Sequence, residues 1–214
     1  MSAPTVGRTT ASERLELLDW KRKVFDLYRQ VRAEPEPETA WRSWRDTRDG
    51  LIANHPQSPV ESAQRAGFRP AYFDYDPAAR VLADVVPVEV EDEAVPMSRD
   101  DGTRFTQFGD AAFELYGREL SLGLNWLEAY GGGVFLSFTD ETSGTASYGA
   151  GRYLLDTVKG ADFGTVGEKL VLDFNFAFNP SCAYDPRWAC PLAPPGNRLP
   201  VAVRAGERLP ALTG

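Results

Sequence analysis

Cysteine and histidine are scarce in this chain, with two cysteines and one histidine among 214 residues. Two cysteines are too few for the disulfide framework that stabilises small secreted domains. Apolar runs are short as well. None approaches the roughly 20 residues that cross a bilayer, and the segment from Met1 to Thr10 lacks the charged and then apolar order of a signal peptide. We therefore expect a cytoplasmic protein with no membrane partner.

Positive charge is the next shortage. The 23 lysines and arginines are outnumbered by 31 acidic residues, and the net charge is −8. An acidic surface repels phosphate backbones, so we expect no nucleic-acid partner. Hydrophobic residues, at 43%, and aromatic residues, at 12%, are by contrast abundant. They suffice for a substantial core, and we expect a single globular unit.

Helical patterns occupy the first third of the chain. Thr10 and Glu13 have the spacing of a capping box, and apolar residues follow at helical spacing up to Val31. A second helix is predicted from Thr39 to Asn54, and a short third one begins at Ser58, where proline and glutamate follow in the first turn. We expect two main N-terminal helices.

From Ala71 the pattern changes to short alternating runs separated by turn residues. This texture is typical of an antiparallel meander or barrel, and Gly109-Asp110 and Gly117-Arg118 predict tight hairpin turns. The predicted strands cover residues 72–75, 80–89, 103–108, 112–116, 119–127, 134–138, 147–155, 169–178 and 199–204.

The predicted fold is mainly β (α+β), an antiparallel β-barrel-like domain with two N-terminal helices packed against it. Its organisation is a flexible N-terminus (1–11), a helical segment (12–67) and a barrel-like domain with a Cys/Pro-rich loop (68–208).

The most informative stretch runs from Asp173 to Asn197. Its first part alternates apolar residues with Asp173, Asn175 and Asn179, which predicts a strand with one polar face. That face either meets solvent or lines a polar cavity. Repeated prolines then stiffen the loop that carries both cysteines.

We predict a small-molecule pocket at the mouth of the barrel, because such mouths are recurrent ligand sites. Arg152 has two interpretations: it pairs with a carboxylate, for which Asp173 is a plausible partner, or it holds an anionic ligand. The candidate ligand-binding residues are Tyr148, Arg152, Asp173, Asn175, Asn179, Tyr184 and Asn197.

If the protein is an enzyme, Cys182 is the candidate nucleophile, activated by Arg187 or His55. His55 is the candidate acid or base, although a histidine at a helix end often only hydrogen-bonds the last carbonyls. No pattern indicates a particular cofactor.

Three alternatives to catalysis remain open. Cys182, Cys190 and His55, with Asp173, could hold a metal, although the cysteine spacing is wide for zinc. The two cysteines could form a disulfide. Third, the chain could be a non-catalytic binding or protein-interaction module. Some of its tryptophans either pack the helices on the barrel or are exposed and form a partner patch. These tryptophans are Trp41, Trp44 and Trp188.

Three runs stand out as motifs, R-D-G-L-I-A-N-H-P-Q-S-P (48–59), T-S-G-T-A-S-Y-G-A-G-R-Y (142–153) and the long cysteine-containing run 173–201. Together they resemble the bacterial family catalogued as domain of unknown function 1684. The likeness spans roughly Trp20 to Glu207 and implies a single domain, but it implies no activity, cofactor or catalytic residue. Gly196 stands where the resemblance leads us to expect glutamate, so no role for that acid carries over.

Overall fold

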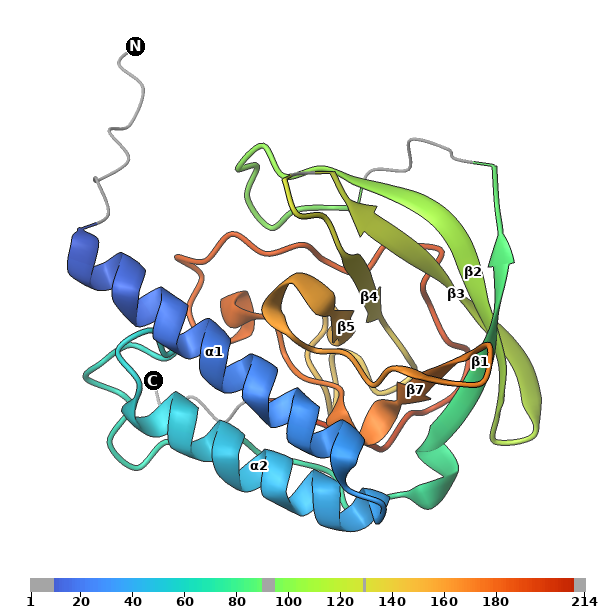
Figure 1. The fold of residues 1–214 in the computed structure, drawn as a ribbon, viewed down its shortest axis with the longest axis horizontal. Coiled ribbons are helices and arrows are strands. Elements are labelled where there is room, and N and C mark those ends of the chain that lie inside the picture. Colours follow the sequence, from blue (N-terminus) through green and yellow to red (C-terminus); the bar gives the residue numbers. More distant parts are fainter. Residues whose placement is uncertain (1–9, 90–94, 129, 210–214) are drawn as a thin grey trace.

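A computed structural model describes residues 10–89, 95–128 and 130–209. Two helices, α1 (Ala11–Ala33) and α2 (Pro37–Asn54), lie beside one end of a curled antiparallel sheet (Figure 1). The predicted class, mainly β with an α+β arrangement, is confirmed. The strands are β1 (Arg80–Pro87), β2 (Phe105–Leu115), β3 (Arg118–Leu127), β4 (Val134–Phe138), β5 (Arg152–Asp156), β6 (Thr165–Val166) and β7 (Lys169–Asp173).

The sheet has the order β5-β4-β3-β2-β1-β7-β6 and curls into a half-barrel. Strand β1 joins its two parts, because residues 80–83 pair with β7 whereas residues 84–87 pair with β2. The described residues also contain four 3₁₀ turns, which are Pro77–Ala79, Thr157–Lys159, Phe174–Phe176 and Ser181–Ala183. Two of them, at 174–176 and 181–183, lie in the stretch that the sequence marked as informative.

Helix α1 begins as predicted. The Glu13 amide donates to Thr10 Oγ1 at 3.2 Å, and the Thr10 amide donates to Glu13 Oε2 at 2.6 Å, so the capping box is formed. The short helix predicted from Ser58 is wrong. Ser58 Oγ accepts from the Val60 amide at 3.2 Å and donates to the Ile52 carbonyl at 2.6 Å, which produces a turn anchored to α2.

The turn predicted at Gly109-Asp110 is also wrong, because both residues lie inside the long strand β2. The pairing with β3 skips a residue between Gln107 and Gly109, which is a β-bulge. A Cβ on Gly109 would lie 3.0 Å from the Val86 carbonyl oxygen, so the glycine permits a close strand approach. The second predicted turn exists and is made by Tyr116 and Gly117, both with positive φ.

The strand predicted for residues 169–178 ends at Asp173. The Asp173 carboxylate accepts from the Asn175 amide at 3.1 Å and caps the 3₁₀ turn Phe174–Phe176, which removes this segment from the sheet. The strand predicted at 147–155 begins only at Arg152. The one at 199–204 is absent, and the one at 72–75 is a single bridge between Tyr72 and Glu207.

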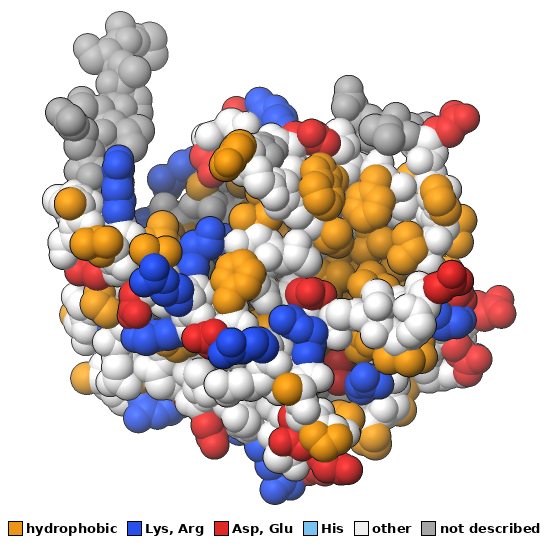
Figure 2. Space-filling model, viewed as in Figure 1, with side chains coloured by type: hydrophobic (Ala, Val, Ile, Leu, Met, Phe, Trp, Pro, Cys, Tyr) orange, Lys and Arg blue, Asp and Glu red, His pale blue; other side chains and the backbone are white. Residues whose placement is uncertain are grey.

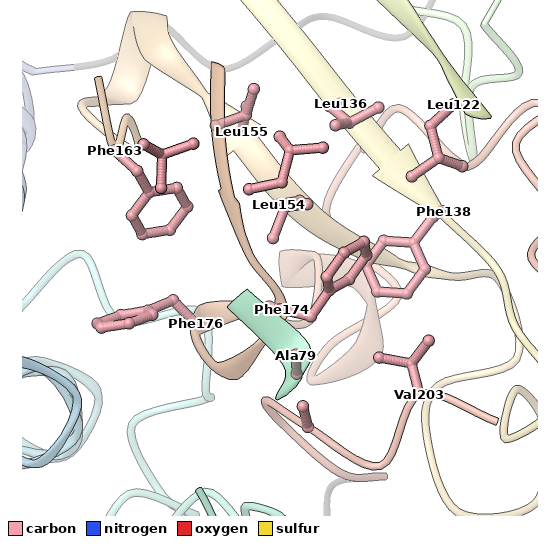
Figure 3. Packing of buried hydrophobic residues seen from close by; sticks show 14 of the residues in the cluster. Ala79, Leu122, Leu136, Phe138, Leu154, Leu155, Phe163, Phe174, Phe176 and Val203 are labelled. Carbon is pink, nitrogen blue, oxygen red and sulfur yellow. The ribbon is translucent and has the colours of Figure 1, made fainter. Parts of the chain in front are cut away.

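The core lies between the concave face of the sheet and the helices. Figure 3 shows Phe174 against Phe138, whose ring centroids are 5.1 Å apart, with Leu154 and Leu122 nearby. Trp44 reaches the same layer, because its ring lies 5.3 Å from that of Phe176.

The tryptophans of α2 pack the helix against the rest of the fold. Trp41 Nε1 donates to the Asn175 carbonyl at 3.0 Å, and Trp44 is 1% exposed. Trp188 Nε1 donates to the Pro59 carbonyl at 3.0 Å. These three side chains therefore do not form the exposed partner patch that the sequence left open.

The open side of the half-barrel is apolar. Figure 2 shows hydrophobic side chains gathered in a hollow on the side of the molecule where β1, β2 and β3 lie. Val85 and Trp126 are 42% and 41% exposed, and Phe108 lies against Trp126 at 6.4 Å between ring centroids. Of the polar residues of the predicted pocket, Asn179 and Tyr184 lie elsewhere, toward the helices.

Candidate functional site

A cavity of about 100 Å³, here called the interlayer cavity, lies between the two helices and the end of the sheet. Helix α1 contributes Trp20 and Tyr28 to its wall, and α2 contributes Trp44 and Arg48. The opposite wall comes from the end of β5 and from the segment that follows Phe178, and includes Tyr153, Asn179 and Tyr184. The wall of the cavity is thus mainly apolar, with several aromatic rings and a few polar groups, which is the usual lining of small-molecule sites.

A buried carboxylate, Glu207, organises the polar side of this cavity. Its side chain is fully buried and accepts from Arg48 Nε and Nη2, each at 3.0 Å, and from the Tyr184 hydroxyl at 2.8 Å. The backbone N–H of Asn179 donates to Oε2, the same oxygen that accepts from Arg48 Nη2. Burial, followed by the charge of Glu207, raises the pKa of Tyr184, so the phenol keeps the proton that it donates.

Asn179 is the predicted ligand residue whose hydrogen bonding is incomplete. Its Nδ2 donates to the Arg208 carbonyl at 2.8 Å, which fixes the orientation of the amide. Its Oδ1 is buried and has no hydrogen-bond partner among the described residues. The residue is 3% exposed and forms part of the cavity wall. An unpaired buried acceptor is uncommon and expensive, so this oxygen is a candidate contact for a ligand.

Cys182 and Cys190 lie together in the proline-rich loop, and neither belongs to the wall of the interlayer cavity. The Cys182 amide donates to Cys190 Sγ at 3.2 Å, and the Tyr148 hydroxyl donates to Cys182 Sγ at 3.9 Å. Both thiols are free; Cys182 is partly exposed and Cys190 is buried. The hydrogen bond from Cys190, helped by that from Tyr148, lowers the pKa of Cys182 to about 6. The same interaction raises the pKa of Cys190.

The predicted activators of Cys182 have other partners. His55 Nδ1 accepts from the Gln57 amide at 3.1 Å, so the neutral ring carries its proton on Nε2, which lies 3.0 Å from Asp19 Oδ2. Arg187 pairs with Asp185 at 3.2 Å and stacks on the Trp188 ring. The thiolate of Cys182 is favoured by a thiol and a phenol instead.

Arg152 pairs with Asp140 and not with Asp173. Its Nη2 donates to Asp140 Oδ2 at 2.6 Å and to the Val203 carbonyl at 3.0 Å. Its Nη1 donates to the carbonyls of Ala205 and Glu207. Arg152 is 1% exposed, and both of its terminal nitrogens are bound to these acceptors. Arg152 therefore makes a structural ion pair with a partner other than the one proposed, and neither terminal nitrogen is free for an anionic ligand.

Three further predicted ligand residues make structural contacts. Asp173 and Asn175 bind each other, and Asn175 also exchanges hydrogen bonds of 2.8 Å with the backbone of Asp76. Burial raises the pKa of Asp173 to about 6. Asn197 accepts from the Gly123 amide at 2.7 Å and donates to the Ser137 carbonyl at 2.9 Å, which holds the C-terminal loop against β3 and β4.

The structure does not assemble the metal set that the sequence allowed. Cys182 and Cys190 lie together, whereas His55 and Asp173 each lie with the partners described above. Within the described ranges, no three histidine, cysteine or acidic side chains gather closely enough to hold a metal ion.

Sequence reasoning missed Arg48 and Glu207, which join the helices to the loop. One signal for Arg48 was present: it lies one helical turn after Trp44 and one turn before Ile52, on the apolar face of α2. An arginine on such a face indicates a buried acidic partner. No periodicity marks Glu207, because its segment has no regular secondary structure.

Comparisons with known proteins identify a family and a similar fold. Residues 69–208, well over half of the chain, match the family model described as Protein of unknown function (DUF1684). The solution structure of an uncharacterized protein from Haloarcula marismortui is similar, with a TM-score of 0.56 and 34% identity over 80% of this chain and 93% of that one. Among curated proteins none matches. No helix in the described ranges is long and apolar enough to cross a membrane. The chain belongs to the DUF1684 family.

Proposed function

We propose that the protein binds a small, neutral, largely apolar molecule with one hydrogen-bond donor in the interlayer cavity. The cavity, at about 100 Å³, is smaller than the apolar cavity of about 150 Å³ that holds benzene, so it supports a ligand built on no more than a single six-membered ring. Its aromatic walls favour a flat or compact apolar body.

The Oδ1 of Asn179, which has no hydrogen-bond partner in the part of the chain that the structure describes, carries this proposal. A buried acceptor without a partner costs about 1–3 kcal/mol. A hydroxyl or N–H group on the ligand would donate to this oxygen and recover that cost. The amide cannot easily turn to avoid the penalty, because Nδ2 is held by the Arg208 carbonyl.

The charged residues of the wall support a neutral ligand. Arg48 and Glu207 neutralise each other through two hydrogen bonds, and Tyr184 donates to the same carboxylate. Asp156 likewise pairs with Lys159 at 3.1 Å. A charged ligand would have to separate one of these pairs, and breaking the buried Arg48–Glu207 pair costs several kcal/mol, whereas Lys159 is 62% exposed and its pair contributes less.

Three compounds of similar size test the proposal: phenol, which has a donor, fluorobenzene, in which a fluorine that cannot donate replaces the hydroxyl, and benzene, which has neither group. Binding is measured by calorimetry and by chemical-shift changes in the full-length protein. We expect phenol to bind about tenfold more tightly than the other two, because one hydrogen bond contributes about 1.4 kcal/mol. Equal affinity for all three would contradict the proposal.

Variants locate the contact. Asn179→Ala should remove the preference for phenol while benzene still binds, whereas Asn54→Ala, on the exposed surface of α2, should change neither. If the preference for phenol survives in Asn179→Ala, the donor contact lies elsewhere and the assignment of Asn179 is wrong.

A further inference from the structure

We propose that Cys182 and Cys190 form a redox-active dithiol that a small hydroperoxide converts to a disulfide. The two thiols are brought together by the 3₁₀ turn Ser181–Ala183 and by a loop that returns to it, since the Cys182 amide donates to Cys190 Sγ at 3.2 Å. This activity is independent of ligand binding in the interlayer cavity, whose wall contains neither sulfur.

The two cysteines differ in the way that such a reaction requires. Cys182 is partly exposed, so an oxidant reaches it, whereas Cys190 is only 5% exposed. Donation from Cys190 and from the Tyr148 hydroxyl stabilises negative charge on the Cys182 sulfur, whose pKa is about 6. At neutral pH Cys182 is therefore mainly thiolate, and Cys190 keeps its proton.

The surroundings hold the loop in place around the pair. The Cys190 amide donates to Ser98 Oγ at 2.8 Å, and the Ser98 amide donates to the Cys190 carbonyl at 2.8 Å. Tyr153 also lies close to Cys190, and its hydroxyl donates to the Pro191 carbonyl. The polar groups near the two sulfurs are thus the phenols of Tyr148 and Tyr153 and the hydroxyl of Ser98. The charge of Lys159 has a weaker influence on Cys190.

The first step oxidises Cys182. Its thiolate attacks one oxygen of the peroxide, an S–O bond forms, the O–O bond breaks, and the hydroxide or alkoxide that leaves takes a proton from solvent. The product is a sulfenic acid at Cys182, which holds one peroxide oxygen, and the leaving group has become water from hydrogen peroxide or an alcohol from an alkyl hydroperoxide.

The second step forms the bridge. The sulfenic acid carries no charge, so the interaction that raised the pKa of Cys190 is lost and its thiol ionises more readily. The Cys190 sulfur attacks the Cys182 sulfur, the S–O bond breaks, and the leaving hydroxide combines with the Cys190 proton as water. A dithiol reductant reverses the change.

Intact-mass measurement of the reduced full-length protein with hydrogen peroxide at pH 7 tests the pathway. The wild-type protein should lose two hydrogens, and peptide mapping should place the bridge between Cys182 and Cys190. Cys190→Ser should stop at a sulfenic acid that dimedone traps, and Cys182→Ser should not react over the same time. The proposal would be overturned if Cys182→Ser were oxidised at the wild-type rate. It would also be overturned if the wild-type protein gained the mass of an oxygen atom and did not lose two hydrogens.

The pH profile separates this thiolate from an ordinary one. With a pKa of about 6, the rate should rise about tenfold from pH 5 to pH 7 and then level off. An ordinary thiol, with a pKa near 8.5, would instead rise about a hundredfold over that range and continue to rise to pH 9.

Tyr148→Phe should move this inflection to higher pH while disulfide formation persists, because the phenol is a positioning residue. Circular dichroism of each reduced variant checks folding, and Cys→Ala variants replace any serine variant that does not fold. A wild-type rate that keeps rising between pH 7 and pH 9 would overturn the assigned role of Cys182.

Discussion

Glu207 and Arg48 form a bidentate ion pair, with Nε and Nη2 of the arginine each 3.0 Å from a different carboxylate oxygen. The carboxylate is fully buried, and the arginine side chain is 15% exposed. The pair connects α2 to the last part of the described chain, and Tyr184 adds a third hydrogen bond. It therefore couples the helical layer to the cysteine-containing loop.

Replacing Glu207 by Gln should reduce the free energy of unfolding by about 3–5 kcal/mol, because it leaves the Arg48 charge without its partner. Urea denaturation measures the change. Glu38→Gln is the matched control, since Glu38 forms an exposed pair with Arg42 that should contribute less than about 1 kcal/mol. A loss for Glu207→Gln no larger than the control's would show that the buried pair contributes little.

Arg152→Ala should lower stability and leave phenol binding unchanged, because Arg152 binds Asp140 and backbone carbonyls and does not line the cavity. The expected loss is about 3–5 kcal/mol, the cost of breaking a buried pair. Asp140→Asn, which keeps the shape and removes the charge, replaces it if the alanine variant does not fold. Weaker phenol binding by the folded variant would count against a purely structural role.

Asp173 should make stability depend on pH. Its folded pKa, about 6, is above its unfolded value near 3.9, so folding favours the protonated form. The associated stability is fully present below pH 4 and is lost as pH rises through 6, with a total of order 3 kcal/mol. The unfolding free energy of the wild-type protein minus that of Asp173→Asn should therefore fall between pH 4 and pH 7. A constant difference would show that burial does not shift this carboxyl.

Gly160→Ala should be more destabilising than Gly167→Ala. Both glycines have positive φ, 96° and 61°, so each alanine costs about 1 kcal/mol of backbone strain. A Cβ on Gly160 would in addition lie 3.0 Å from Cα of Phe25 in α1, whereas one on Gly167 meets nothing within 4 Å. Thermal unfolding of both variants gives the difference. Equal effects would mean that α1 shifts freely away from the sheet.

Closing the Cys182–Cys190 bridge should stabilise the fold by about 2–3 kcal/mol through loop entropy. The measurement is urea denaturation of the oxidised and reduced wild-type protein, with Cys190→Ser treated in parallel as a control. A stability that falls on oxidation would indicate that the bridge strains the loop.

The sequence predicted the elements that local rules determine and missed those that depend on distant partners. The capping box of α1 and the strand predicted at residues 119–127 need only neighbouring residues, and both appear in the structure, the strand as β3. The alternation after Asp173 suggested a longer strand, but the carboxylate caps a 3₁₀ turn instead. Capping by the Asp173 side chain therefore replaces the strand pairing that would have continued beyond this residue.

The candidate site shows the same division. Asn179, Tyr184 and Cys182 were found because unusual residues cluster in one stretch. Glu207 was missed because its partner Arg48 lies 159 positions away in the sequence. Asp140 was likewise missed as the partner of Arg152, since the turn that presents it gives no sign of burial. Long-range charge pairing has no periodicity, so a single sequence does not display it.

The guanidinium of Arg152 has a consequence for the order in which the protein folds. In the described structure the segment that carries Val203, Ala205 and Glu207 is not part of a strand, and this one side chain binds three of its carbonyls as a neighbouring strand would. Arg152 can therefore be buried with these hydrogen bonds only after residues 203–207 have docked, so that docking and the closing of the core around Arg152 should occur as one event.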